Sequence, residues 1–255
     1  MPTPLEKFAH LSQFDNLTHF VTNSSIGNIS YTTHDNSTLI QENRQKLAEA
    51  VGITVNDFCV PQQTHAANVA LITEQHRGMG AWKAETALPA TDALITQTQG
   101  ICLTVLSADC ALLLLYDAKN NAVGAVHSGW RGTMQHIAQH TLEAMHASFG
   151  TNPAQVWVGI APCISTDVYE VGEEVVEATL KSFGTMAHYL AYNKATARWH
   201  FDLRYANSQM LQNVGVPKSQ IEISPMCTYL NPHLYYSARL TQGKTGRFGA
   251  GIMLK

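Results

Sequence analysis

The chain has 255 residues, of which 45% are hydrophobic and 14% are charged, and its formal net charge is −3. This composition excludes a disordered chain, and the charge excludes the basic footprint of a nucleic-acid-binding protein. The longest apolar run, Ala111 to Tyr116, is far shorter than the about 20 residues of a membrane span. The N-terminus lacks the apolar core of a signal peptide. We therefore expect a cytoplasmic protein without nucleic-acid or membrane partners.

The pattern of apolar residues predicts an α+β protein with mixed β-sheet layers flanked by helices, because strand patterns alternate with single helices. No linker or repeat divides the chain, so we expect one domain over residues 1–255. The first helix has Thr38 and Gln41 at capping-box spacing. In chain order the predicted elements are a helix at Thr38–Val51; strands at Phe58–Val60, Val69–Thr73, Ala93–Thr96, Ile101–Leu106, Ala111–Tyr116 and Ala122–His127; a helix at Thr133–Phe149; a strand at Val156–Ile160; helices at Gly172–Phe183 and Leu203–Val214; and strands at Ile221–Ser224 and Phe248–Met253.

Common cofactor and nucleophile motifs are absent from the sequence. There is no dinucleotide fingerprint, nucleophile elbow or H-E-x-x-H motif, and the five cysteines include no C-x-x-C pair. His136 and His140 have metal-ligand spacing on a predicted helix. The apolar residues beside them define the buried side, so we expect both histidines to face solvent.

Three polar segments interrupt or flank the apolar strands, and each contains a potential zinc ligand: His65, Cys110 and His127. Polar groups at the ends of buried strands are costly unless they are paired or bound. Two histidines and one cysteine leave the fourth tetrahedral position open, as in a catalytic zinc site. The same residue types also fit a core histidine, a buried thiol and a capping histidine.

The segment after His127 also has the features of an anion site. Gly129 and Gly132 flank Trp130-Arg131 where a helix is predicted to begin. Amide groups at such a helix start favour an anion, and Arg131 could add a guanidinium donor. The same sequence also fits an ordinary turn with an arginine at the surface.

An ordered set of motifs resembles the YfiH-like family, known as laccase-domain or multicopper polyphenol oxidoreductases and also described as purine nucleoside phosphorylases. The resemblance covers about residues 18–255, and the segment H-S-G-W-R-G at His127–Gly132 is its most specific part. The other matching segments are Glu42-Asn43-Arg44, Gln63-Thr64-His65, Ala108-Asp109-Cys110, Tyr169-Glu170-Val171 and Asp202-Leu203 with Asn207.

The resemblance implies a zinc ion bound by His65, Cys110 and His127. It implies phosphorolysis of adenosine, inosine and methylthioadenosine, together with deamination of adenosine, for which zinc can activate water. The partners would be a purine nucleoside and phosphate, and the fold would be similar to that of necrotizing-factor-type cysteine hydrolases.

We assign further roles to residues around the expected zinc ligands. Cys110, His127, Asp109 and Arg44 are the predicted catalytic residues, and Arg44, Arg131 and Gln63 are the predicted phosphate- or substrate-binding residues. Asp109 or Asp92 could move protons. The plainer alternatives are that Asp109 caps a turn and that Arg44 is a solvated helix residue.

The chain departs from the family pattern in two places. Ser25 stands where the loop T-R-x-G-G-V-S has its arginine, and Y-S-Y-R-R-D is reduced to Tyr236-Ser237-Ala238-Arg239-Leu240. Both departures concern the expected contacts to substrate.

Three other functions are compatible with the same residues. A copper-dependent polyphenol oxidase would also use two histidines and a cysteine, although the chain has none of the His-x-His pairs of a laccase. A cysteine hydrolase acting in cell-wall peptide editing would use Cys110 as nucleophile and His127 as base. The third is a metal-stabilised binding protein without turnover. We expect a monomer or a small homo-oligomer.

Overall fold

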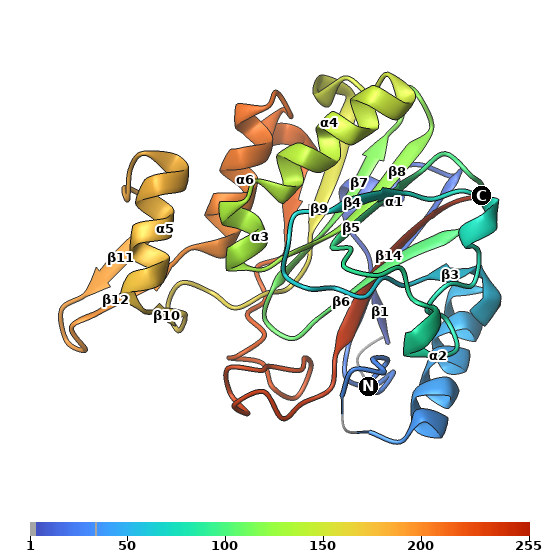
Figure 1. Ribbon diagram of the computed structural model, residues 1–255, viewed down its shortest axis with the longest axis horizontal. Coiled ribbons are helices and arrows are strands. Elements are labelled where there is room, and N and C mark those ends of the chain that lie inside the picture. Colours follow the sequence, from blue (N-terminus) through green and yellow to red (C-terminus); the bar gives the residue numbers. More distant parts are fainter. Residues whose placement is uncertain (1–3, 34) are drawn as a thin grey trace.

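The computed structural model describes residues 4–33 and 35–255, and its centre is a pair of mixed β-sheets that lie face to face (Figure 1). One sheet has the strand order β1-β2-β14-β6-β3 and the other has the order β13-β9-β7-β8-β5-β4. The strands of the first sheet are β1 (Leu5–Glu6), β2 (Leu17–Thr22), β14 (Phe248–Leu254), β6 (Cys102–Ser107) and β3 (Phe58–Cys59). Those of the second are β13 (Ile221–Ile223), β9 (Val156–Ile160), β7 (Ala111–Asp117), β8 (Ala122–Ser128), β5 (Ala93–Thr96) and β4 (Val69–Leu71).

Side chains from both sheets form the inner core. Leu112 and Leu114 of β7 contact this core together with Val105 of β6 and Ile252 of β14. Successive side chains of a strand point to opposite faces, so Leu113 of β7 belongs to the outer core on the other side of the sheet. Both faces of β7 are therefore covered, which explains its continuous apolar sequence.

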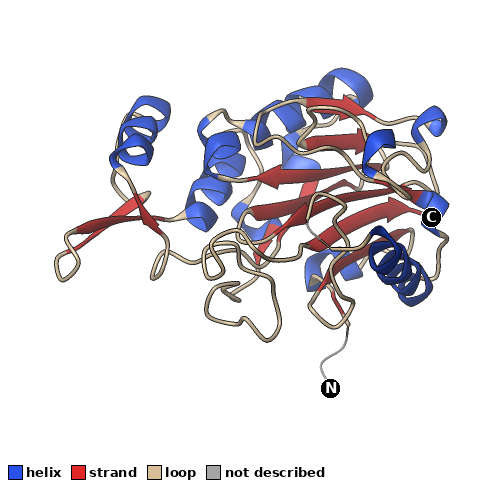
Figure 2. Ribbon diagram, turned by 60° about the horizontal axis from the view of Figure 1, so that its bottom comes forward, coloured by secondary structure: helices blue, strands red, loops and turns tan. Residues whose placement is uncertain are grey.

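Helices cover the outer faces of both sheets (Figure 2). The helix α2 (Ser37–Val51) packs on the first sheet through Leu47 and Ala48. The second sheet is covered by α3 (Trp130–Met134), α4 (Ile137–Phe149) and α6 (Leu203–Asn213), and the short α1 (Ala9–Ser12) contacts β9. The predicted α+β fold with mixed sheets flanked by helices is confirmed. The expected likeness to necrotizing-factor-type hydrolases stays a prediction.

A third, small sheet projects from the body of the molecule with one helix beside it, at the left of Figure 1. Its strand order is β10-β12-β11, with β10 (Glu170–Val171), β12 (Arg198–Phe201) and β11 (Leu190–Asn193), and the helix is α5 (Glu173–Phe183). The chain enters and leaves this unit at one place, because the amide of Phe201 donates to the carbonyl of Tyr169 at 3.1 Å.

The structure differs in three respects from the predictions made for the helices. Asn36, rather than Thr38, caps α2, since its side chain accepts a hydrogen bond from the Thr38 amide. The single helix predicted over 133–149 is two helices, and His136 separates them with a φ of 58°. His136 does not face solvent as expected, because its Nε2 lies 3.0 Å from the Ser182 hydroxyl of α5. His140 is exposed.

Among the described residues, no helix combines the length and the apolar character needed to cross a membrane.

Candidate metal centre

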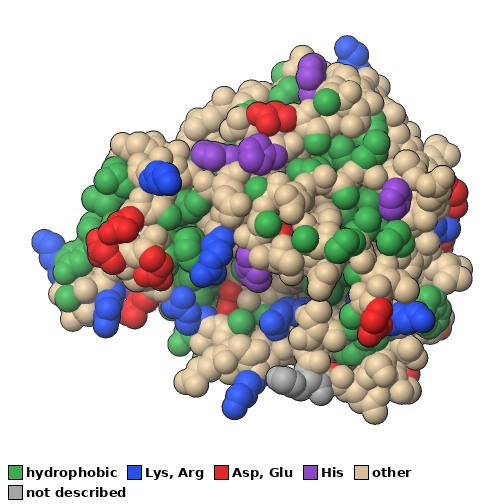
Figure 3. Space-filling model, in the orientation of Figure 1, with side chains coloured by type: hydrophobic (Ala, Val, Ile, Leu, Met, Phe, Trp, Pro, Cys, Tyr) green, Lys and Arg blue, Asp and Glu red, His purple; other side chains and the backbone are tan. Residues whose placement is uncertain are grey.

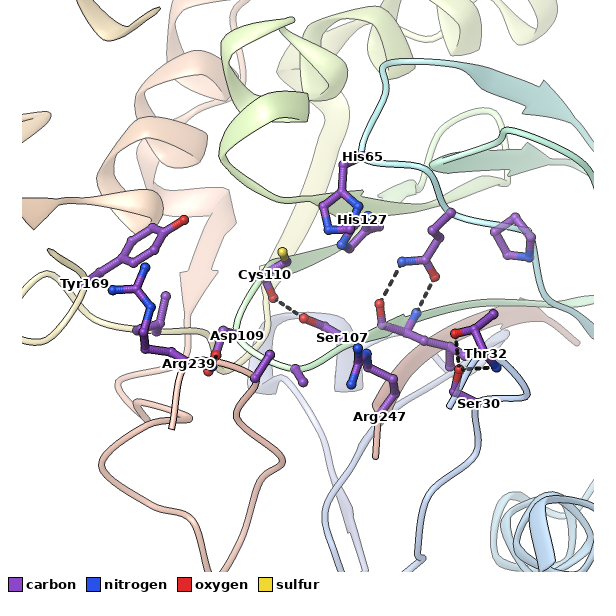
Figure 4. Close-up of a pocket in the computed structure, with 16 residues that line it drawn as sticks. Ser30, Thr32, His65, Ser107, Asp109, Cys110, His127, Tyr169, Arg239 and Arg247 are labelled. Atoms are coloured by element: carbon purple, nitrogen blue, oxygen red, sulfur yellow. Dashed lines mark hydrogen bonds between the residues drawn. The ribbon is translucent and has the colours of Figure 1, made fainter. Parts of the chain in front are cut away.

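Three potential ligands from separate parts of the chain converge at one edge of the second sheet (Figure 4). The ligand atoms of His65, Cys110 and His127 all lie within 4.8 Å of one another. The two imidazole rings meet edge to face, with their centroids 4.8 Å apart. The structure thus brings together the three residues that the sequence analysis selected as metal ligands.

Strand pairing positions two of the ligands. Cys110 ends the turn between β6 and β7, and His127 lies opposite Leu112 in the antiparallel pair of β7 and β8. The Ser107 hydroxyl donates to the Cys110 carbonyl at 2.7 Å and closes the turn. His65 comes from the loop before β4 and has a φ of 60°.

The buried carboxylate of Asp92 holds both histidines in place. One oxygen lies 2.8 Å from Nδ1 of His127 and accepts the His65 amide at 3.0 Å. The other accepts the Ala66 amide at 2.9 Å. With Nδ1 of His127 bound to Asp92, Nε2 is left to face the cluster, as in many carboxylate–histidine–metal sites. Burial alone would raise the pKa of Asp92, but the hydrogen bonds from His127 and the backbone lower it below its usual value.

Cys110 and His127 favour each other's charged forms. Burial opposes the thiolate, but the contacts with His127 and His65 lower the pKa of Cys110 to about 6. Burial likewise opposes the imidazolium, but Cys110 and Asp92 raise the pKa of His127 to about 9. A thiolate is the form of cysteine that binds a metal.

The absence of a side chain at Gly129 leaves room for the cluster. A Cβ atom on this residue would lie 2.8 Å from the Cys110 sulfur and 3.1 Å from Cδ2 of His65. A side chain here would therefore push on two of the three ligand residues. The donor set, the oriented histidine and this clearance together fit a zinc ion, and two histidines with a thiolate also suit copper.

The cluster opens into a cavity of about 420 Å³, within the usual size range of small-molecule sites. Two arginines line it, Arg239 beside Tyr169 and Arg247 below the Ser107 turn (Figure 4). No carboxylate among the described residues forms an ion pair with either arginine. Figure 3 shows the hollow, with histidine and cationic side chains at its rim. The cavity therefore combines a metal-ligand cluster with positive charge that is available to an anion.

Known proteins match the chain over most of its length. The model of the family described as "Multi-copper polyphenol oxidoreductase laccase" matches residues 21–255. The chain belongs to this family. It is 35% identical to a purine nucleoside phosphorylase of Bacteroides thetaiotaomicron, over 97% of this chain and 95% of that protein. It is 36% identical to adenosine deaminase RL5 from an unknown prokaryotic organism, over 87% of this chain and 84% of that protein.

Solved structures confirm the family and the fold. YfiH of Bacillus licheniformis superimposes with a TM-score of 0.91 at 28% identity, covering 99% of each chain. YlmD of Geobacillus stearothermophilus also gives a TM-score of 0.91, at 27% identity and with 100% of each chain covered.

Arg44, which belongs to the family's E-N-R segment, does not reach the cavity. Its side chain is 3% exposed, and Nε donates to the carbonyl of Ile29 at 2.8 Å. Nη1 donates to the carbonyls of Gly80 and Ala81. Burial lowers the pKa of Arg44 to about 10. The predicted role in phosphate binding is therefore not supported by its position, and Arg44 instead joins α2 to two loops. It is not the solvated helix residue of the alternative either.

Arg131 also lies outside the cavity. Its guanidinium is exposed and stacks on the Trp130 ring, 4.3 Å from the ring centroid. The helix that begins here, α3, has only five residues. The Thr133 amide in this helix donates to the Gly129 carbonyl at 2.9 Å. The position of Arg131 therefore does not support the predicted role in phosphate binding, whereas Gly129 of the same motif makes room for the cluster.

Gln63 and Asp109 line the cavity, but hydrogen bonds to the protein occupy their polar groups. The Gln63 amide exchanges two hydrogen bonds with the backbone of Leu106, at 2.7 and 2.8 Å. The Asp109 carboxylate accepts hydrogen bonds from the segment that contains Arg239. Both residues hold loops of the site together.

Arg239 and Arg247 line the cavity, although neither was predicted from the sequence to be a site residue. Both lie in the C-terminal segment without regular structure, where no periodicity shows which side chains point inward. The signal available was the position of Arg239 in the reduced family motif. Ser25, at the place of the family's loop arginine, is exposed and lies outside the cavity lining.

Proposed function

We propose that this protein is a zinc-dependent enzyme that cleaves purine nucleosides by phosphorolysis and also deaminates adenosine. The observation that carries the proposal is the presence of the His65–Cys110–His127 cluster and two guanidinium groups in one cavity. The names of the relatives, purine nucleoside phosphorylase and adenosine deaminase, agree with it.

Arg239 and Arg247 are the residues that we assign to phosphate. Guanidinium groups bind phosphate oxygens through paired hydrogen bonds. Arg247 uses Nη1 for the carbonyls of Thr245 and Gly246, at 2.8 and 2.9 Å, and this contact fixes its direction. The pKa of Arg247 is lowered, because burial outweighs the opposite effect of the nearby Cys110 and Asp109. A phosphate in this position would offset the cost of holding a cation there.

Phosphorolysis forms a bond between a phosphate oxygen and the anomeric carbon of the ribose while the bond to the purine nitrogen breaks. Holding both reactants in one orientation can supply about 7–11 kcal/mol of the required barrier reduction. Zinc, when bound by His65, Cys110 and His127, supplies Lewis-acid chemistry and activates water, which deamination needs. Asp92 keeps Nε2 of His127 directed at the cluster.

Two alternative functions make different predictions about metal content and products. A laccase needs several coppers, whereas the described residues contain a single group of three or more metal-ligating side chains. A cysteine hydrolase is favoured by the chain of contacts from Cys110 through His127 to Asp92. That enzyme would need no metal.

The test uses one preparation, stripped of metal and reloaded with zinc or with copper. With adenosine and phosphate, the zinc form should release adenine and ribose 1-phosphate, together with some inosine. Oxygen uptake with a phenol in the copper form alone would show a phenol oxidase. Peptide cleavage that survives chelation and is lost on thiol alkylation would show a hydrolase.

Arginine variants then test the assigned phosphate contacts. Arg239→Ala and Arg247→Ala should each raise the KM for phosphate strongly. Arg131→Ala is the matched control, because its guanidinium is exposed and outside the cavity. Equal effects in all three variants would contradict the assignment.

A further inference from the structure

The carboxylate of Asp109 joins the turn that carries Cys110 to the segment that carries Arg239. One oxygen accepts the Thr228 hydroxyl at 2.6 Å. The other accepts the Ser237 hydroxyl at 3.1 Å and the Arg239 amide at 2.7 Å. Asp109 is 8% exposed, so these contacts are largely shielded from water.

The main chain of Asp109 is fixed as well. Its φ of 97° is one that side-chain-bearing residues rarely adopt. Its carbonyl accepts the Ile164 amide at 3.0 Å, and the next residue is the ligand Cys110. The unusual backbone conformation and the hydrogen bond to Ile164 fix the position of Asp109, so that its carboxylate points toward the C-terminal segment.

Arg239 depends on this contact, because it lies in a segment without regular structure. Its amide is held by Asp109, Nη1 donates to the Glu170 carbonyl at 2.7 Å, and its guanidinium lies 5.1 Å from the Tyr169 ring centroid. Within the described part of the chain, Nε and Nη2 have no hydrogen-bond partner. Those two groups are the ones available to an anion.

We propose that Asp109 is a positioning residue for phosphate: it holds the main chain at Arg239 so that this arginine lines the cavity. All three of its partners donate hydrogen bonds to it, and the one from the Arg239 amide comes from the main chain, whose position decides where the side chain begins. This proposal rests on the proposed function, since it assigns Arg239 to phosphate.

The test measures the binding of inorganic phosphate to the zinc-loaded protein by titration calorimetry, together with zinc content and kinetics. Asp109→Asn places an amide N–H2 among three donors, so the segment must shift. Phosphate binding should weaken about ten- to a hundredfold. Zinc content should be unchanged, and the KM for phosphate should rise more than kcat falls. Combining D109N with R239A should weaken binding no further than R239A alone.

Asp117→Asn is the matched control. Asp117 is also a buried carboxylate, at the other end of β7, and it accepts the amides of Lys119 and Asn120 at 3.0 and 3.1 Å. It should leave phosphate binding unchanged. Thr228→Val removes one donor to Asp109 at nearly constant volume and serves as the second variant if D109N does not fold. It should weaken phosphate binding in the same direction, by a smaller factor.

The proposal would be overturned by unchanged phosphate binding in both D109N and T228V, by full additivity of D109N with R239A, or by loss of zinc in D109N. If R239A abolished phosphate binding and D109N retained it, this proposal would be wrong and the proposed function would stand. Absence of phosphate binding by the wild-type protein would overturn both it and the proposed function.

Discussion

At the scale of single residues, the space around a ligand matters as much as the ligand itself. Gly129 illustrates this, because its φ of −73° is accessible to any residue. What excludes a side chain is the nearness of Cys110 and His65. The glycine of the H-S-G-W-R-G motif is thus explained by clearance and not by backbone conformation.

Gly129→Ala should lower zinc affinity about ten- to a hundredfold, the usual cost of disturbing the groups around metal ligands. Competition with a chromophoric chelator measures this. Gly124→Ala in β8, the strand that precedes Gly129, is the control, because its Cβ would meet neighbours only at ordinary distances of 3.5 Å or more. Equal zinc affinity in both variants would contradict the clearance argument.

His19 should make the protein sensitive to acid. Burial, aided by Lys7, lowers its pKa from 6.5 to about 4, and its Nε2 accepts the Phe8 amide at 3.0 Å. The unfolded chain therefore binds a proton below about pH 6.5, whereas the folded protein binds it only near pH 4. Stability should fall by up to about 3 kcal/mol over this range.

Urea unfolding at pH 7, 5.5 and 4.5 measures the loss, with His19→Gln as a variant that does not titrate. The free energy of unfolding of the variant should decrease less over this range than that of the wild type. If the free energy of unfolding decreased equally in the variant and the wild type, His19 would be excluded as the source of the acid sensitivity.

At the scale of elements, a buried polar network ties the helix α6 to the end of the strand that carries His127. Asn207 accepts the Ser128 hydroxyl at 2.6 Å and donates to the Thr133 hydroxyl at 3.2 Å. Asp202 caps the same helix by accepting the Tyr205 amide at 2.8 Å. The family segment D-L-x-x-x-N is therefore structural.

Asn207→Ala should destabilise the protein by about 2–4 kcal/mol, because it leaves a cavity and unpaired buried hydroxyls. The folded fraction should keep its kcat, since Asn207 does not line the cavity. Urea unfolding and steady-state kinetics separate the two effects. Asn213→Ala, at the exposed end of α6, should change stability by less than about 0.5 kcal/mol.

The sequence predicts the long apolar strands well, because burial on both faces leaves them few polar residues. It does not reveal the break at His136, since the apolar periodicity continues from α3 into α4. The strands β10 to β12 are short and partly exposed, so alternation is weak in them. Residue type and position at strand ends made His65, Cys110 and His127 candidate ligands, and the family resemblance decided between this interpretation and ordinary buried residues. The direction of an arginine side chain depends on carbonyl groups far away in the sequence, so the sequence does not show that Arg44 points away from the cavity and that Arg239 lines it.

At the scale of the whole molecule, the cluster forms only when distant segments meet. His65 comes from a loop, and Cys110 and His127 come from paired strands. Zinc that binds the folded state should therefore stabilise it, by about 2.7 kcal/mol at a free concentration of 100 times Kd. Removal by a chelator should lower Tm, and Cys110→Ala should abolish that difference.

Zinc binding should also release a proton. The pKa of Cys110 is about 6 and that of His127 is about 9, so at pH 7.5 the metal-free cluster holds a thiolate and a protonated His127. Zinc displaces the proton of His127, so its affinity should rise with pH up to about 9. Calorimetry in buffers of different ionisation enthalpy should show about one proton released. A pH-independent affinity would contradict this charge state.

The projecting unit of β10 to β12 and α5 starts and ends on the antiparallel strands β10 and β12, beside the hydrogen bond between Phe201 and Tyr169. A segment whose ends adjoin can change in length without moving the strands on either side of it. The exposed turn between Asn193 and Arg198 could therefore change in length while the strands that carry Cys110 and His127 keep their places. Tyr169 and the Glu170 carbonyl lie at the base of this unit and hold Arg239. A change in the unit would thus alter the surroundings of Arg239 before it altered the ligand cluster.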